Sequence, residues 1–199
     1  SQGTIRKHLA KVPVRKEGIA MSFFSQKREK ANRALVEQIL LERYDQYYRL
    51  AYRYVHHEAD AFDIVQNGAY KAIRGSHALK EPQYAQTWVY RIMLNECFQY
   101  LKRPSAASYE KLQDRYGLEG EAAEDHYADI DLQKALETLG EKDRSVVILK
   151  YFEDMKLSEI ADILEENVNT VKSRLYRSLR KLQGLLLEEA EKGGTAYGA

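Results

Sequence analysis

The chain has 199 residues, 44% of them apolar and 31% charged, so it can form one medium-sized or two small globular domains. Its formal net charge of +1 excludes a uniformly polycationic nucleic-acid coat. With Cys97 as the single cysteine, an intrachain disulfide and a cysteine-based zinc site are both excluded, and we expect a reducing compartment. No apolar run approaches the ~18 residues of a membrane span, so the expected location is cytoplasmic.

The N-terminal segment is strongly basic. Residues 1–33 contain nine Lys or Arg against two Glu, a net charge of about +7. This segment has no continuous apolar stretch, so we expect residues 1–34 to form a basic extension that is partly disordered. Met21 is a candidate native start, which makes residues 1–20 candidates for non-native or processed sequence.

Two amphipathic helices are predicted next. Apolar side chains recur at three- and four-residue steps over residues 35–55, which predicts one long helix with an aromatic-rich face. A second apolar face covers residues 62–73, with Asp60 as its expected N-cap and Gly75 as its end. The chain has only three prolines and no segment that alternates like a strand, so the expected fold class is all-α.

A loop and a very apolar helix complete this first domain, residues 35–104. The stretch GSHALKEPQYAQT, residues 75–87, holds turn residues and a proline, which predicts a loop. The following segment, WVYRIMLNECFQYLKR, is apolar except for a few ordered positions. Arg91, Asn95 and Gln99 are spaced by four residues and therefore form one polar stripe on an otherwise buried helix.

An acidic linker is predicted between two domains. Residues 105–131 contain eight Asp or Glu against two Lys or Arg, and their periodicity fades. We therefore expect a flexible linker at residues 105–128. Helical periodicity returns in a second domain, residues 129–187, and the glycine-rich end, residues 188–199, is expected to be a disordered tail.

The second domain contains the stretch SEIADILEENVNTVKSRLYRSLRKL, two amphipathic patterns separated by a short polar break. Asn167 lies at the break and is a residue type that caps the N-terminus of a helix. The second pattern has an apolar side and an opposite side rich in basic and hydrogen-bonding residues, as a helix in the DNA major groove requires.

The alternative is an amphipathic hairpin whose charged face is only solvated. Between Val168 and Lys181 there are five basic residues and no acidic one, whereas an ordinary solvated face mixes both signs. This asymmetry favours a helix-turn-helix that binds DNA.

Two parts of the sequence resemble a known family. The stretch from Ser158 to Leu182, preceded by ALETLGEKDRSVVILKYFEDMKL, resembles domain four of the bacterial extracytoplasmic-function sigma factors of the sigma-70 family. DAFDIVQNGAYKAIRG, residues 60–75, resembles the helix of domain two that binds the polymerase clamp, and residues 87–103 resemble its promoter-melting helix. The two motif sets occur in family order and cover roughly residues 35–187, which is more specific than either set alone.

The resemblance implies a non-enzymatic, two-domain sigma factor without metal or cofactor. Its implied partners are core RNA polymerase, contacted at the clamp of the largest subunit and at the flap, and promoter DNA. An anti-sigma factor, expected to be membrane-bound, is a further implied partner.

The implied site residues form three sets. The core polymerase-binding set is Asp63, Ile64, Val65 and Gln66. The minus-ten set is Tyr84, Trp88, Arg91, Asn95 and Gln99, beside a loop, residues 76–87, that captures a flipped base. The minus-thirty-five set is Asn169, Thr170, Lys172, Ser173, Arg174, Tyr176, Arg177 and Arg180, of which Arg174 and Arg180 are assigned to phosphates.

Three positions depart from the family pattern. Phe62 stands where the clamp motif is usually acidic, and Gly140 stands where a proline commonly follows Leu139. Glu165 falls where a glycine commonly opens the helix-turn-helix turn. A non-glycine residue is therefore expected to hold a positive φ there, at a cost of order 1 kcal/mol.

Two other interpretations stay open at this level. A metalloenzyme would need clustered ligands; His57 and Asp60 satisfy a helical ligand spacing weakly, and a polar turn between helices fits these residues better. A stand-alone helix-turn-helix regulator that binds duplex DNA would use the same C-terminal motif but would not need the two helices of domain two.

Overall fold

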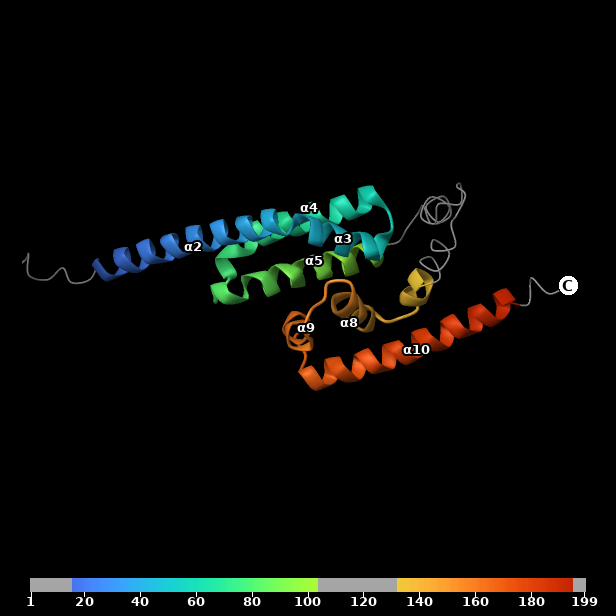
Figure 1. Cartoon of the computed structure of the whole chain (residues 1–199). Helices are drawn as coiled ribbons and strands as arrows, with labels where there is room; N and C mark the ends of the chain where they lie inside the picture. Colours follow the sequence, from blue (N-terminus) through green and yellow to red (C-terminus); the bar gives the residue numbers. More distant parts are fainter. Residues whose placement is uncertain (1–15, 104–131, 195–199) are drawn as a thin grey trace, which may run out of the picture.

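The computed structural model describes residues 16–103 and 132–194, and every regular element within these ranges is helical, as expected for an all-α fold (Figure 1). Residues 132–137 are also helical. The elements are α2 (Lys16–Glu42), α3 (Tyr44–Val55), α4 (Glu58–Gly75), η2 (Ser76–Ala78), η3 (Pro82–Tyr84), α5 (Ala85–Leu101), α8 (Glu141–Tyr151), α9 (Leu157–Leu164) and α10 (Val168–Gly194).

The first domain is a bundle in which α3 and α4 pack on α5, and α2 lies along them (Figure 1). Large aromatic side chains fill its core: Tyr47, Tyr54 and Tyr90 are almost fully buried, and the Tyr47 and Tyr90 rings meet edge to face with centroids 4.9 Å apart. Edge-to-face packing is a preferred geometry for aromatic pairs. The aromatic-rich face predicted from the sequence is thus the core face.

The prediction of one helix over residues 35–55 was wrong. The chain turns at Arg43, where φ is −117° and ψ is 15°, and α3 begins one residue later. In the other direction α2 extends back to Lys16, so the expected domain boundary at residue 34 falls inside a helix. The break carries neither glycine nor proline, and the apolar periodicity continues across it, so no local sequence signal marks it.

The start of α4 also differs from the prediction, although its end at Gly75 is confirmed. His57, not Asp60, is the N-cap: its Nδ1 accepts from the backbone N–H of Asp60 at 3.4 Å. The same imidazole lies 3.3 Å from the Asp60 carboxylate. Among the residues whose side chains the structure describes, 25–103 and 132–187, no group of three metal-ligating side chains occurs.

The second domain has the predicted helix-turn-helix. α9 and α10 pack on α8 around Ile148, Leu149, Ile160 and Val171, which are fully or almost fully buried. Asn167 caps α10 as expected, because its Oδ1 accepts from the backbone N–H of Thr170 at 2.8 Å. The predicted disordered tail from residue 188 was wrong in part, since α10 continues to Gly194.

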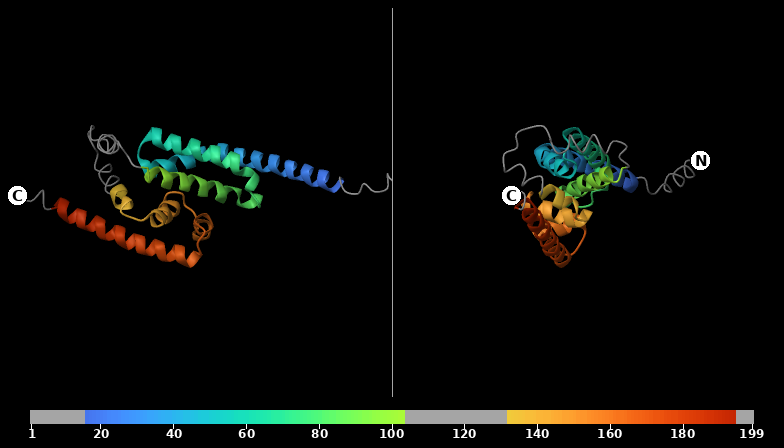
Figure 2. Two further views of the ribbon diagram at one scale, coloured as in Figure 1. Left: turned by 180° about the vertical axis from the view of Figure 1, so that it is seen from behind. Right: turned by 90° about the vertical axis from the view of Figure 1, so that its right-hand side faces the viewer.

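The two domains are in contact. α5 of the first domain lies against α9 of the second, and α10 lies on the far side of α8 and α9 (Figures 1 and 2). The predicted linker, residues 105–128, lies outside the described residues. Among the helices that the structure describes, none is long and apolar enough to cross a membrane.

Candidate nucleic-acid interface

The outer face of α10 carries the predicted minus-thirty-five set. Lys172, Ser173, Tyr176 and Arg177 are exposed along one side of the helix, as are Asn169 and Arg180. Thr170 is half-buried. The opposite side packs into the domain through Val171, Leu175, Ser178 and Leu182. The helix therefore presents a continuous basic and hydrogen-bonding surface to solvent, while its apolar side holds it on α8 and α9.

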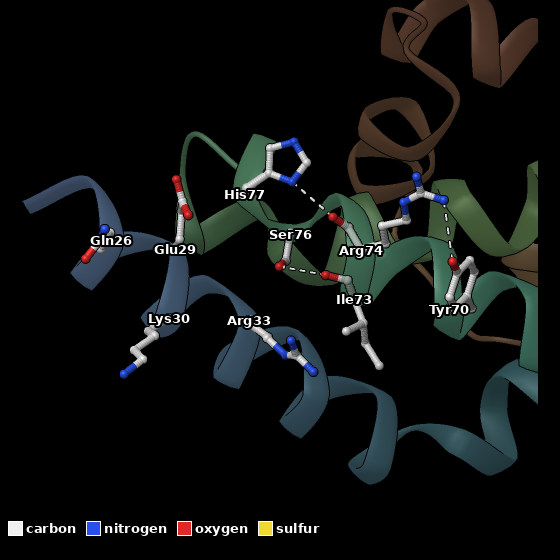
Figure 3. Close-up of a pocket in the computed structure, with 9 residues that line it drawn as sticks. All are labelled: Gln26, Glu29, Lys30, Arg33, Tyr70, Ile73, Arg74, Ser76 and His77. Carbon is white, nitrogen blue, oxygen red and sulfur yellow. Dashed lines mark hydrogen bonds between the residues drawn. The ribbon is translucent and has the colours of Figure 1, made fainter. Parts of the chain in front are cut away.

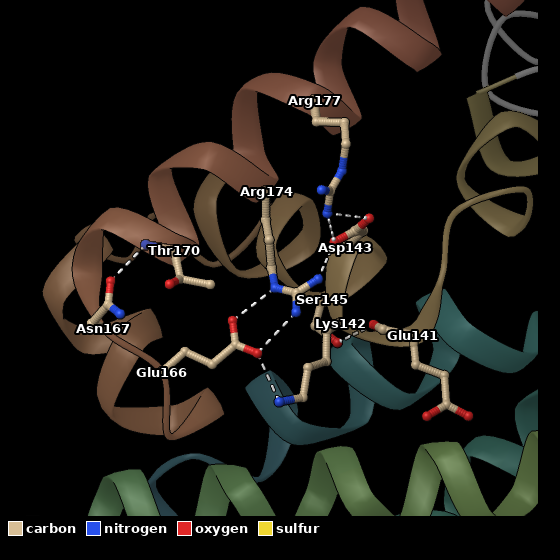
Figure 4. Close-up of polar contacts among 9 residues, drawn as sticks. All are labelled: Glu141, Lys142, Asp143, Ser145, Glu166, Asn167, Thr170, Arg174 and Arg177. Atoms are coloured by element: carbon tan, nitrogen blue, oxygen red, sulfur yellow. Dashed lines mark hydrogen bonds and ion pairs between the residues drawn. The ribbon is translucent and has the colours of Figure 1, made fainter.

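Arg174 differs from the rest of this set, because three nitrogens of its guanidinium donate within the domain (Figure 4). Nε and Nη2 donate to the two carboxylate oxygens of Glu166 at 2.7 and 3.0 Å, and Nη1 donates to Asp143 at 2.7 Å. Arg177 also donates to both Asp143 carboxylate oxygens at 3.1 Å, but through Nη2 alone, and its side chain is 65% exposed. Lys142 adds a second cation at 2.8 Å from Glu166. Arg174 therefore joins α10 to α8 and to the turn after α9, and the predicted phosphate contact is not available to it in this arrangement.

The charges of this network stabilise one another. Hydrogen bonds from Arg174, followed by the one from Lys142, hold the pKa of the Glu166 carboxyl below its usual value. The bonds to Glu166 and Asp143 likewise raise the pKa of Arg174. Charge-assisted bonds of this bidentate kind also fix geometry, so α10 is held at a defined angle to α8.

The turn between α9 and α10 confirms the expectation for Glu165. This residue has φ 55° and ψ 42°, a left-handed conformation that a non-glycine residue adopts at a cost of order 1 kcal/mol. Its carboxylate meets the Arg91 guanidinium of α5 at 2.5 Å. The side chain that a glycine would lack thus makes a contact between the two domains.

Arg91 was predicted to belong to the minus-ten set, but here it binds the second domain. Its Nε and Nη2 donate to the carbonyl oxygens of Ile163 and Asp162 at 3.2 and 2.8 Å, beside the ion pair with Glu165. A cation at the C-terminal carbonyls of α9 is favoured by the helix dipole. Arg91 is therefore unavailable to DNA while the domains are together.

The other members of the minus-ten set lie on or near the loop and on α5. Asn95 and Gln99 are exposed on α5, and Tyr84 is exposed at the end of the loop. Trp88 is only half-exposed, and its ring lies 3.4 Å from the point where a Cβ on Gly75 would be. Tyr84 is therefore the more accessible of the two aromatic side chains.

The clamp motif on α4 divides into two pairs. Asp63 and Gln66 are exposed, whereas Ile64 and Val65 are each 2% exposed and belong to the core. Direct contact with a partner is thus open to the first pair, and the second pair holds the helix in place. Phe62 is 48% exposed, so this departure from the family pattern adds an apolar side chain to the surface.

An apolar groove on the second domain was not predicted from the sequence. The groove lies between α8 and the second half of α10, has a volume of about 490 Å³ and is almost entirely hydrocarbon. Leu186 and Leu187 continue the apolar side of α10 beyond Leu179 and Leu182. Its lining includes Leu132, Val147, Tyr151, Leu179, Leu186 and Leu187.

Comparison with known families assigns both domains. Residues 40–106 match the model of sigma-70 region 2, and residues 129–182 match that of sigma-70 region 4. The chain is 35% identical over 165 residues to the RNA polymerase sigma factor SigV of Bacillus subtilis (strain 168), spanning 82% of this chain and 98% of that protein. It is 29% identical over 155 residues to the ECF RNA polymerase sigma factor SigM of Mycobacterium tuberculosis, spanning 78% and 79% of the two chains.

Two solved structures have a similar fold. CnrH, solved in complex with the cytosolic domain of CnrY, aligns with a TM-score of 0.58 at 22% identity over 82% of this chain and 95% of that one. The sigma factor RpoE of Bartonella quintana, in complex with the anti-sigma factor NepR, aligns with a TM-score of 0.56 at 25% identity over 75% and 95%. A stand-alone regulator that binds duplex DNA would not need region 2, so the match to region 2 disfavours that interpretation.

Proposed function

Because this chain belongs to the extracytoplasmic-function sigma factors of the sigma-70 family, which bind core RNA polymerase and direct promoter-specific initiation without being enzymes, we propose how its residues divide that work. The second domain reads the minus-thirty-five element in duplex DNA, and the first domain binds the clamp and the opened minus-ten strand. The observation that carries the proposal is the exposed face of α10 between Val168 and Lys181, with its basic and hydrogen-bonding side chains and no acidic one.

At the minus-thirty-five element, Lys172, Ser173, Tyr176 and Arg177 lie where side chains can reach base edges when α10 enters the major groove. The flanking residues contact the sugar-phosphate backbone of the DNA; they are Asn169, Thr170 and Arg180. Arg174 acts differently, as a positioning residue that holds α10 through Glu166 and Asp143.

At the minus-ten element, the loop of residues 76–87 captures an extruded base, and Asn95 and Gln99 face the strand from α5. A flipped base offers its Watson–Crick edge and both ring faces, so Tyr84 can stack on it. Trp88 supports the loop by packing near Gly75. Arg91 joins this surface only after α9 has moved away from α5.

Contacts with polymerase use both domains. Asp63 and Gln66 bind the clamp, and Ile64 and Val65 keep α4 seated in the bundle. The flap packs into the apolar groove between α8 and α10, which offers a nearly pure hydrocarbon lining. These assignments place the chain in the cytoplasm, where polymerase and promoter are found.

An anti-sigma factor, expected to be membrane-bound, is the proposed inhibitor. The support is that RpoE of Bartonella quintana was solved with an anti-sigma factor and CnrH was solved with the cytosolic domain of CnrY. The apolar groove is a surface that such an inhibitor would compete for with polymerase.

The test combines each of two protein variants with replacement of each of the two promoter elements. Holoenzyme assembled from the full chain and bacterial core polymerase first selects a promoter from a randomised library. We expect Lys172→Ala to lower transcription about 10-fold or more, since a good base contact contributes ~1–3 kcal/mol, and to have no further effect once the minus-thirty-five bases are replaced. Asn95→Ala should show the same pattern with the minus-ten bases.

Each variant serves as the control for the other, since the two residues lie in different domains. The division of labour is wrong if both variants respond equally to replacement of either element. It is also wrong if Lys172→Ala prevents binding to core polymerase while the purified chain stays folded.

A further inference from the structure

A cavity of about 810 Å³ lies where the middle of α2 meets the end of α4 and η2 (Figure 3). From α2 it is lined by Gln26, Glu29, Lys30 and Arg33. From the other side it is lined by Tyr70, Ile73, Arg74, Ser76 and His77. The α2 part of the lining precedes residue 40, where the match to sigma-70 region 2 begins, whereas the other side of the cavity falls within that match.

The cavity has a fixed shape because α2 is tied to the loop that borders it. The Asn32 side chain is 2% exposed, and its Nδ2 donates to the carbonyl oxygens of Ser76 and Leu79 at 3.2 and 2.8 Å. An amide NH₂ has two protons, so these two bonds use both of them. Ser76 is itself held by its hydroxyl on the Ile73 carbonyl at 2.8 Å.

The charge of the lining suits an anion. Lys30, Arg33 and Arg74 contribute three cations, against the single carboxylate of Glu29. The ion pair of Arg33 with Glu37 is solvent-exposed on both sides and therefore weak. Within the described part of the chain, Lys30 and Arg74 have no carboxylate partner within 4.0 Å, so both remain open to a ligand.

An aromatic side chain lies among these cations. Tyr70 is 63% exposed, and its hydroxyl accepts from Arg74 Nη1 at 3.4 Å. Cations next to an exposed aromatic ring are the combination that binds single-stranded nucleic acid, since the cations follow the backbone while the ring stacks on a base. Duplex DNA, whose bases are already stacked, does not use such a ring.

The position of the cavity identifies the strand. Ser76 and His77 line it and also begin the loop that, in the proposed function, captures the flipped minus-ten base. α4 separates its charges along its length, with Glu58, Asp60 and Asp63 at the clamp end and Arg74 at the cavity end, one turn after Lys71, which is ion-paired with Glu96. The cavity end is therefore suited to a polyanion and not to the partner of Asp63.

We propose that this cavity binds the sugar-phosphate backbone of the opened promoter strand, one or two nucleotides from the captured base, and so extends the minus-ten interface onto the α2 helix. The proposal rests on the proposed capture of the minus-ten base by residues 76–87. Lys30 and Arg74 bind phosphate, and Tyr70 stacks on a neighbouring base.

The test uses holoenzyme and a fluorescent single-stranded oligonucleotide that carries the selected minus-ten element. The cavity variant is Lys30→Gln with Arg74→Gln. The matched control is Lys27→Gln with Arg28→Gln, which removes the same charge from exposed positions of α2 outside the cavity lining. Binding is followed by fluorescence anisotropy between about 50 and 200 mM salt.

We expect the cavity variant to bind about 3- to 10-fold more weakly with unchanged base preference. The salt dependence of log K should become shallower by about 0.7 for each lost phosphate contact. The control should keep the wild-type slope. In a scan of single methylphosphonate substitutions, neutralising one or two phosphates beside the element should weaken wild-type binding and have no further effect on the cavity variant.

Equal slopes for the cavity variant and the control would overturn the inference, as would methylphosphonate effects that are additive with the variant at every position. Loss of core polymerase binding in the cavity variant, with oligonucleotide binding unchanged, would identify the cavity as a protein contact and overturn it as well. If wild-type holoenzyme shows no preference for the minus-ten sequence, the proposed function itself fails. If that preference is present and the cavity variant behaves like the control, only the proposal for the cavity fails.

Discussion

Lys172 and Arg174 are two residues apart in α10, yet their surroundings differ. Lys172 is exposed on the face that we assign to DNA, whereas the Arg174 side chain is 25% exposed and ion-paired with Glu166 and Asp143. Sequence pattern alone placed both in one set of basic residues. The distinction depends on carboxylates from α8 and from the turn, which no spacing within α10 reveals.

Replacing Arg174 by Ala should therefore lower the free energy of unfolding by about 1–3 kcal/mol, because it leaves two partly buried carboxylates without their main cation. Lys172→Ala should change it by less than about 0.5 kcal/mol, as for an ordinary surface position. Urea denaturation of the full chain measures both. A fully stable Arg174→Ala protein with a lost minus-thirty-five preference would show that Arg174 reads DNA instead.

Glu166 predicts a specific acid sensitivity. Its pKa lies below the usual 4.5 in the folded protein because Arg174 and Lys142 bind the ionised form. The stability that it contributes is therefore complete above about pH 4.5 and is lost as the pH falls through the lower, folded-state value. Glu166→Gln should reduce stability at pH 7 and flatten its fall between about pH 5 and 3 in thermal melts. An unchanged pH profile would exclude this coupling.

At the scale of elements, local signals identified three helix ends, although they named Asp60 in place of His57 as the N-cap of α4. The Asn167 cap, the end of α4 at Gly75 and the left-handed Glu165 were all predicted and are confirmed. The break between α2 and α3 was missed because the apolar periodicity continues through it. The full length of α10 was missed because its last turns are polar and rich in glycine. The role of Asn32 was also missed, because its partners are 44 and 47 residues away.

Asn32→Asp tests how α2 supports the loop. The change keeps the shape of the side chain but replaces both N–H donors with an acceptor facing two carbonyl oxygens, so the loop should lose its anchor. Selection of minus-ten sequences by the variant holoenzyme should become less specific, while the minus-thirty-five preference remains. The control is Gln38→Glu, the same chemical change on the exposed side of α2. Equal selection profiles for both variants would remove Asn32 from loop positioning.

For the whole molecule, the feature that sequence could not provide is the contact between the domains. Tyr54 of α3 is buried against α8, with its hydroxyl 2.7 Å from Ser145 Oγ. Ser145 already donates to the Glu141 carbonyl at 2.7 Å, so Tyr54 is the donor. This contact and the hydrogen bonds of Arg91 in α5 to the end of α9 keep the second domain against the first. The outer face of α10 stays open to solvent.

A double-mutant cycle between Tyr54→Phe and Ser145→Ala tests whether the domains stay together in solution. We expect a coupling free energy of about 1 kcal/mol in urea denaturation, because Ser145→Ala leaves the buried Tyr54 hydroxyl without its acceptor. Pairing either change with Lys172→Ala, which is remote from the contact, should give additive effects. Additivity between Tyr54 and Ser145 would mean that the domains are separate in the free protein.

The two domains are proposed to act together in promoter recognition only when both are bound to core polymerase. The direct measurement is run-off transcription on the selected promoter by core polymerase, with and without the full chain, together with duplex binding by the chain alone. We expect specific transcripts only when both proteins are present, and we expect them to be lost when either element is scrambled. The free chain should bind duplex DNA only weakly. Tight, sequence-specific duplex binding by the chain alone, without any effect on the start sites of core polymerase, would contradict this proposal.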